Sequence, residues 1–215
     1  MAQHPKQLIV EDNDTRGMVS ALMGYHVPWG VNANTWPCEI RPAGSADQVL
    51  DPDALYTAYM VSGLQALGII VDADDKFGSR WAKIKQFCDN GRFSHVPRQM
   101  PKNGLILKGK GGKFFGAWIM PDNQSSGMVE TFCKYLVPDK HAALWSHAEE
   151  VTRSSKIIGA PWIDAHREKA EIHSWLAWQN PPGERMGPAI TKKMLDPHSS
   201  YAKPFVAWFK KLYMI

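Results

Sequence analysis

The sequence predicts an α/β fold, in which a mainly parallel sheet of about four strands is flanked by helices. Two short apolar runs, residues 7–10 (QLIV) and 67–71 (LGIIV), each end abruptly in a cluster of carboxylates. Such continuous apolar runs are typical of parallel strands, which are buried on both faces. Segments with helical spacing follow both runs, and this alternation of strand and helix favours a parallel sheet.

The first half of the chain carries clear start and stop signals for these elements. Asp14 is the predicted N-cap of the first helix, and Asp51 with Pro52 opens the second, because an acidic cap and an early proline both suit a helix start. Gly91 ends the third helix. The expected elements are a strand over 7–10, a helix over 15–23, a loop over 25–37, a short strand over 39–41, a helix over 54–65, a strand over 67–71 and a helix over 78–90.

The second half is expected to complete the sheet and then to turn helical. Strands over 105–107 and 113–120 are joined by a glycine-lysine turn, and helices follow over 127–136, 140–152, 167–178 and 201–213. With no repeat and no long linker, we expect one domain over 1–215, which consists of a core over 6–137 and a C-terminal helical extension over 138–215.

Composition narrows the class of protein. A hydrophobic fraction of 44% is enough for a core, and a net charge of +4 is compatible with a polyanionic partner. We see no signal peptide and no apolar run near the length that a membrane span needs. Cys38, Cys88 and Cys133 show no CxxC spacing, which argues against a disulfide framework or a zinc site and for a reducing compartment. We therefore expect a cytoplasmic protein that does not bind membranes.

Carboxylates at the ends of the two clearest strands are the strongest chemical signal. Glu11 follows the first strand directly, and Asp72-Ala73-Asp74 follows the later one. Parallel neighbours bring such residues to one edge of the sheet, where open α/β proteins place their functional crevice. Carboxylates about 4 Å apart repel by roughly 4 kcal/mol at an effective dielectric of 20, so a cation is needed to hold them together. Oxygen ligands alone suit Mg²⁺ or Mn²⁺, although strand-end acids can also be ordinary helix caps in solvated loops.

This order of motifs resembles the Toprim domain, which topoisomerases, bacterial primases and OLD-family nucleases share. The resemblance rests on a strand that ends in Glu and a strand some sixty residues later that ends in Asp-x-Asp. The stretches WIMPDNQSSGMVETF and REKAEIHSWLAWQNPPGERMGPAI also resemble compact, stand-alone Toprim-like proteins related to the OLD family. The resemblance covers most of the chain and implies a Toprim-like fold. One departure is Asp12, where these families usually have glycine; it alters the backbone approach to a phosphate or adds an acidic ligand.

The resemblance also implies roles for single residues. Glu11 would be a metal ligand or general acid/base, and Asp72 with Asp74 would bind the metal. Glu130 would complete a second metal position, and Lys169 would stabilise charge on the phosphate. Two further acids, Asp14 and Asp122, are additional candidate ligands. Relatives of this type often act beside an ABC- or AAA-type ATPase, in systems such as antiphage defence, and the resemblance implies such a partner here.

A lysine-glycine turn is a candidate contact to the nucleic-acid backbone. Lys108, Lys110 and Lys113 lie within KGKGGK, and lysines neutralise phosphates without sequence preference. The alternative is a solvated hairpin turn. The turn lacks the ending of a P-loop, and no GxSxG motif supports an acyl-transfer hydrolase. Among the histidines we retain only His173, four residues after Lys169 on the same expected helix.

The sequence thus predicts a Mg²⁺- or Mn²⁺-dependent nuclease that hydrolyses phosphodiester bonds in DNA or RNA. The alternative is a non-enzymatic Toprim-like subunit that binds nucleic acid or an ATPase partner. Nucleotidyl transfer would use the same metals, but the chain of 215 residues leaves little room for a polymerising module. The sequence gives no prediction of oligomeric state.

Overall fold

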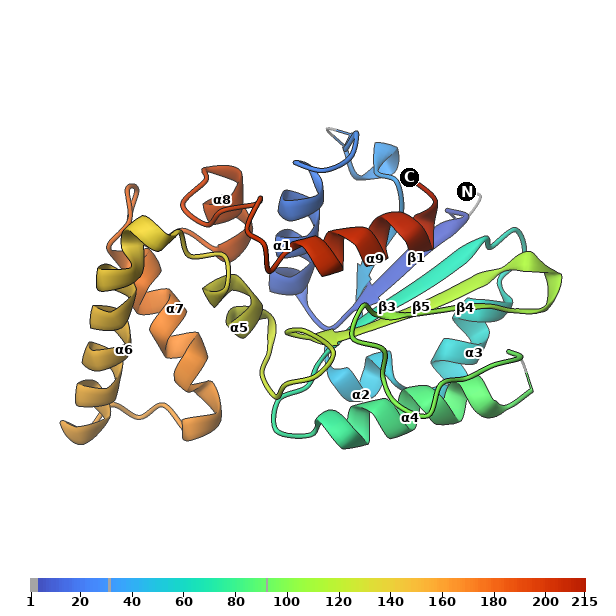
Figure 1. The fold of residues 1–215 in the computed structure, drawn as a ribbon, viewed down its shortest axis with the longest axis horizontal. Coiled ribbons are helices and arrows are strands. Elements are labelled where there is room, and N and C mark those ends of the chain that lie inside the picture. The colour runs from blue at the N-terminus through green and yellow to red at the C-terminus, as the bar shows by residue number, and fades with distance from the viewer. Residues whose placement is uncertain (1–3, 31, 92) are drawn as a thin grey trace.

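The computed structural model of the chain describes residues 4–30, 32–91 and 93–215, and these form an α/β fold (Figure 1). Its five-stranded sheet has the order β2 (Glu39–Pro42), β1 (Lys6–Val10), β3 (Ala66–Asp72), β5 (Phe114–Met120) and β4 (Leu105–Lys108). The first four strands pair in parallel and β4 pairs antiparallel with β5. The predicted fold class is confirmed, with β4 as an antiparallel edge strand beside four parallel ones.

Helices cover both faces of this sheet (Figure 1). On one face lie α2 (Ala46–Val49), α3 (Pro52–Met60) and α4 (Phe77–Asp89), whose buried residues form one hydrophobic cluster with that face. On the other face, α1 (Asn13–Met23) and α9 (Lys203–Tyr213) pack within a second, larger cluster. Coverage of both faces explains why β3 and β5 are almost continuously apolar.

The last helix, α9, lies directly on the central strands. A Cβ added at Gly68 of β3 would lie 2.4 Å from the Tyr213 hydroxyl, and one at Gly116 of β5 would lie 2.6 Å from Cδ2 of Leu212. The Tyr213 hydroxyl donates to the carbonyl of Gln7 at 2.8 Å. Glycine on adjacent strands therefore lets α9 approach the sheet closely, so that the end of the chain packs into the same core as its beginning.

The remaining helices lie beyond the carboxyl ends of the parallel strands. These are α5 (Val129–Lys134), α6 (Ala142–Ile157), α7 (Arg167–Ala177) and α8 (Met186–Thr191). Helices α6 and α7 form an antiparallel hairpin that stands off this edge of the sheet, with α5 between the hairpin and the strands (Figure 1). Short 3₁₀ turns occupy Ala33–Thr35, Lys110–Gly112, Asp139–His141 and Asp164–His166.

Several predicted boundaries are corrected by local chemistry. Asp12, not Asp14, caps α1, because its Oδ1 accepts the Thr15 N–H at 2.8 Å. The helix predicted over 54–65 ends at Met60, since Gly63 adopts a positive φ of 76° in the turn before β3. Helix α6 runs five residues further than predicted, to 157 rather than 152. The short helices α2 and α8 were not predicted, because four and six residues are too few for a periodic signal.

Two further sequence expectations concern segments that the structure describes only in part. The loop predicted over 25–37 includes residue 31, and the N-terminus predicted to lack a signal peptide includes residues 1–3, all outside the described residues. Among the helices that are described, none has the length and apolar character that crossing a membrane requires. Cys38, Cys88 and Cys133 are all buried, and none of the three forms a disulfide.

Candidate functional site

Glu11 and Asp72 lie side by side, because their strands β1 and β3 are parallel neighbours. The backbone N–H of Asp72 donates to Oε1 of Glu11 at 2.7 Å. The Asp72 side chain is held in turn by the N–H of Val129, which donates to its Oδ1 at 3.1 Å. Each carboxylate therefore uses one oxygen in these described contacts and has its second oxygen for a ligand. The predicted meeting of the two strand ends is present in the structure.

Burial leaves these two acids in an environment that opposes their ionisation. Burial raises the pKa of Glu11 to about 7, against the lowering effect of the hydrogen bond from the Asp72 N–H. Burial, followed by repulsion from Glu11 and Glu130, raises the pKa of Asp72 well above its ordinary value. Such perturbed acids are characteristic of functional sites, and a bound cation would remove the repulsion between them.

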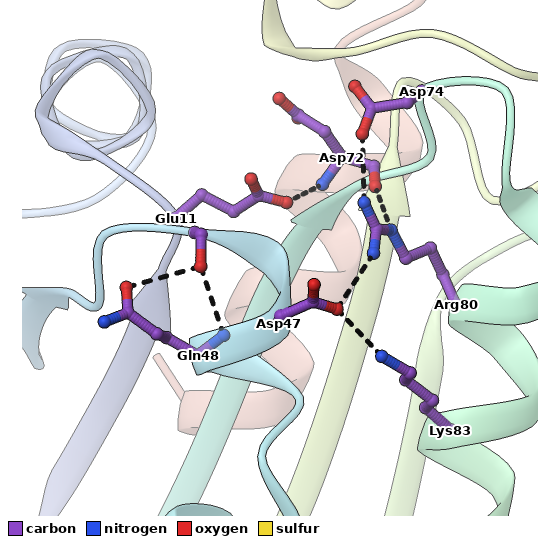
Figure 2. Close-up of polar contacts among 8 residues, drawn as sticks. Glu11, Asp47, Gln48, Asp72, Asp74, Arg80 and Lys83 are labelled. Atoms are coloured by element: carbon purple, nitrogen blue, oxygen red, sulfur yellow. Dashed lines mark hydrogen bonds and ion pairs between the residues drawn. The ribbon is translucent and has the colours of Figure 1, made fainter.

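Asp74 occupies a different environment from Asp72, although only one residue separates them. Its backbone exchanges two hydrogen bonds with Gly127, both at 2.8 Å, and its φ of 50° is left-handed. Its carboxylate Oδ2 accepts a bond from the guanidinium of Arg80 at 3.0 Å (Figure 2). The same arginine donates through Nε to the backbone carbonyl of Asp72 at 3.2 Å. The charge of Asp74 is thus already compensated by a protein side chain.

Glu130 adds a further carboxylate to the acidic cluster, from helix α5 and not from a strand end. It lies in the first turn of α5, is only 2% exposed, and pairs through Oε1 with the ammonium of Lys169 on α7 at 3.2 Å. Attraction by Glu130 raises the pKa of Lys169, so this side chain carries a positive charge at neutral pH. A second contact joins the same helices, because the Thr131 hydroxyl donates to Glu168. Glu11, Asp72, Asp74, Glu130 and Lys169 therefore gather at one edge of the sheet.

The two additional candidate acids lie less centrally. Asp14 is in the first turn of α1, where its charge contributes to the raised pKa of Lys169. Asp122 uses both of its oxygens in its own loop, since Oδ1 accepts the N–H groups of Gln124 and Ser125 and Oδ2 accepts the Ser125 hydroxyl. The structure gives Asp122 a local structural role.

The lysine-glycine turn lies at the opposite end of the sheet. It connects β4 to the start of β5, whereas the carboxylates follow the ends of the parallel strands. Seven residues of β5 separate the two edges, which is roughly 20 Å at about 3.3 Å per residue. The ammonium of Lys113 also donates to the carbonyls of Tyr59 and Val61. Lys108, Lys110 and Lys113 therefore do not border the acidic cluster; His173 lies exposed on α7.

The acidic residues at this edge meet only part of the requirements of a divalent cation. Within the described ranges, no three histidine, cysteine, aspartate or glutamate side chains are gathered closely enough to form a ready-made ligand set. Mg²⁺, however, keeps several waters and is commonly bound through one or two carboxylates together with substrate phosphates. Glu11 and Asp72, which are joined by the bond from the Asp72 N–H to the Glu11 carboxylate, can supply the two carboxylates of that smaller requirement.

A groove that the sequence did not predict opens beside Asp74. It has a volume of about 740 Å³ and lies between the loops at the sheet edge and the start of α7. Lys76 and Met128 line one side, and Arg167 and Glu168 line the other. Arg80 was not predicted either. Neither feature has a local sequence signal, because each depends on how α4 and α7 pack against the strand ends.

Comparison with known proteins assigns a family but no activity. A family model described as "Protein of unknown function (DUF3226)" matches residues 5–214. No curated protein and no solved structure matched the chain.

Proposed function

We propose that this chain, which belongs to the DUF3226 family, is a Mg²⁺- or Mn²⁺-dependent nuclease that hydrolyses phosphodiester bonds in DNA or RNA. The observation that carries the proposal is the adjacent, half-buried pair Glu11 and Asp72 at the carboxyl edge of a parallel sheet. A fold gains nothing in stability from two such acids, since burial and mutual repulsion both oppose their charge. Their position together at the carboxyl edge of a parallel sheet supports a role in holding a cation.

The surrounding residues support phosphate chemistry at this position. Glu11 and Asp72 would hold the ion, which when bound would activate a water and stabilise the leaving oxygen. Lys169 extends from α7 toward Glu130 and has a half-exposed side chain, so its ammonium can contact a phosphate that enters beside the pair. The groove next to Asp74 carries Lys76 and Arg167, which could contact the sugar-phosphate backbone.

The resemblance to Toprim proteins related to the OLD family agrees with this proposal. It adds two finer proposals, that an ABC- or AAA-type ATPase is the partner and that the nuclease serves as an effector in antiphage defence. Both concern regulation of the same site. They predict that the purified chain cuts slowly by itself and faster when such a partner is present.

Cleavage of plasmid DNA and of a structured RNA by the purified protein in Mg²⁺ or Mn²⁺ tests the proposal. Glu11→Gln and Asp72→Asn should each abolish cleavage, because each removes one ligand charge with little change of shape. Glu39→Gln is the matched control. Glu39 is the first residue of β2 and lies opposite Gln7 of β1, so it is at the end of these strands away from the acidic cluster. Equal cleavage by the wild type and both site variants would refute the proposal.

The same proteins separate the enzyme from a non-enzymatic binding subunit. A ligand that binds only the folded state raises the melting temperature by mass action. Stabilisation by Mg²⁺ together with cleavage supports the nuclease. Binding of nucleic acid without any metal-dependent stabilisation or cleavage, with and without an ATPase partner, would support the binding subunit and would contradict our proposal.

A further inference from the structure

Arg80 is a buried cation directly beneath the acidic cluster. It lies in the first turns of α4, and its side chain is only 9% exposed. Its guanidinium bonds to Asp72 and Asp74 and also faces Asp47 of α2 at 3.6 Å (Figure 2). The contact to Asp72 goes to the backbone carbonyl, whereas the contact to Asp74 goes to the carboxylate. One arginine thus contacts both ends of the Asp72–Asp74 turn.

The position of this guanidinium is fixed by its contacts. A buried arginine needs acceptors for its fork of N–H groups, and rotation away from Asp74 would leave several donors without partners. Lys83, one turn further along α4, differs in this respect. It shares Asp47 with Arg80 through a 2.8 Å bond, but its side chain is 44% exposed, and within the described residues no hydrogen bond or ion pair joins it to the Asp72–Asp74 turn (Figure 2). Arg80 is therefore a permanent positive charge beside Asp74.

This charge divides the four predicted metal ligands into two kinds. Asp74 is paired with Arg80, and Glu130 is paired with Lys169. Glu11 and Asp72 have no cationic side chain as a hydrogen-bond or ion-pair partner within the described residues. A divalent ion placed between Glu11 and Asp72 would relieve their repulsion. A second ion placed at Asp74 would instead lie close to a guanidinium that cannot move away.

We propose that Arg80 is a positioning residue that takes the place of a second metal ion on the Asp74 side, so that the chain binds a single divalent cation through Glu11 and Asp72. This inference rests on the proposed function only in that a divalent cation binds at this site. It narrows the ligand set that the sequence suggested, in which Asp74 and Glu130 would also bind metal. In this arrangement Asp74 orients the turn through Arg80 and Gly127.

The stoichiometry of Mn²⁺ binding tests the inference without any measurement of cleavage. The full chain is freed of metal with EDTA, dialysed and titrated with Mn²⁺, and bound ions are counted by calorimetry and by electron paramagnetic resonance. We expect one ion per chain. Asp74→Asn should still bind one ion, with a dissociation constant changed by less than about threefold, whereas Asp72→Asn should weaken binding by about 100-fold, the upper range found even for indirect ligand partners. Two ions in the wild type would overturn the inference.

Arg80→Met provides the reverse test, with Lys83→Met as its matched control. Both remove a positive charge of α4 that contacts Asp47, but only the first releases Asp74. We expect Arg80→Met to bind two Mn²⁺ ions and Lys83→Met to bind one. Should circular dichroism show that Arg80→Met is unfolded, Arg80→Lys replaces it and should remain at one ion. A folded Arg80→Met that binds one ion would contradict our inference.

The outcomes also separate this inference from the proposed nuclease activity. One bound ion without cleavage would support the role of Arg80 and count against the nuclease. Two bound ions with cleavage would support the nuclease and overturn the role of Arg80. Absence of Mn²⁺ binding by the wild type would overturn both.

Discussion

Neutralising Glu11 should stabilise the metal-free protein, although it should abolish activity. Burial holds the pKa of Glu11 at about 7, compared with 4.5 for an exposed glutamate. The folded state therefore binds the proton more tightly than the unfolded chain does. The resulting stability is fully present below pH 4.5 and is lost as the pH rises through about 7. Glu11→Gln cannot ionise, yet its side-chain oxygen can still accept the Asp72 N–H.

The magnitude follows from the size of this pKa change. Raising a pKa from 4.5 to about 7 corresponds to about 3 kcal/mol between low and high pH. Because the charge of Glu11 raises the pKa of Asp72, removal of that charge eases ionisation of Asp72, and we expect a net gain of about 1–3 kcal/mol. The gain should appear at pH 8 and nearly vanish at pH 5. For a chain of this size, about 1 kcal/mol corresponds to a shift of roughly 2–4 °C in Tm.

The assay is urea and thermal unfolding of both proteins in EDTA at pH 5 and pH 8, repeated in Mg²⁺. Mg²⁺ at about 100 times its dissociation constant adds roughly 2.7 kcal/mol to a protein that binds it. The wild type should gain this stability and Glu11→Gln should not. In Mg²⁺ the free energies of unfolding of the two proteins should therefore become similar, or the wild type should become the more stable one. Glu39→Gln is the control for loss of a carboxylate in general. A Glu11→Gln protein that is less stable than the wild type in EDTA at pH 8 would refute the reasoning.

Three further predictions concern the surroundings of the pair. Lys169→Met should leave Glu130 buried and unpaired, which costs about 1–3 kcal/mol in urea unfolding, and should lower cleavage more than Mg²⁺ stabilisation. Gly127→Ala should destabilise by about 1–3 kcal/mol, because a Cβ there lies 2.5 Å from Oγ1 of Thr131 and φ is 133°. Gly17→Ala, inside α1 with no atom within 4 Å of the added Cβ, should instead stabilise by about 0.5–1 kcal/mol.

Matched variants serve as controls for the first two of these predictions. Lys192→Met removes a surface ion pair to Glu184 whose lysine is 44% exposed, and it should change stability by less than about 1 kcal/mol. An equal loss in Lys169→Met and Lys192→Met would contradict the special role of the α5–α7 pair. Gly63→Ala measures the loss of stability that a positive φ causes by itself, since the added Cβ has no atom within 4 Å. If it costs as much as Gly127→Ala, the contact with Thr131 contributes nothing.

Sequence patterns predicted the centre of the site because it depends on strand ends. The runs before Glu11 and Asp72 are apolar on both faces, and that pattern alone fixes where each strand emerges from the core. Arg80 could not be predicted in the same way. An arginine in the first turn of a helix, eight residues after the end of a strand, can point outward as easily as inward, and only the packing of α4 against β5 turns it toward Asp74.

The position of the lysine-glycine turn relative to the acidic cluster was also not predicted. Its composition suggests a phosphate contact, but its position depends on the direction of β4, which a strand of four residues does not reveal. Antiparallel pairing with β5 carries Lys110 to the amino ends of the parallel strands. Binding of nucleic acid at that turn stays a prediction, and it would need a strand that extends roughly 20 Å beyond the acidic cluster.

The two cations of the cluster differ in a way that follows from where they are anchored. Arg80 comes from α4, beneath the sheet edge, and its buried guanidinium cannot leave its acceptors without a large cost. Lys169 comes from the α6–α7 hairpin, and its half-exposed side chain can exchange Glu130 for an incoming phosphate by rotation alone. The contact between Thr131 and Glu168 would keep α5 and α7 together during such an exchange. In the proposed nuclease, the α6–α7 hairpin would therefore supply a cation that can follow the substrate, whereas the cation that α4 supplies would stay in place.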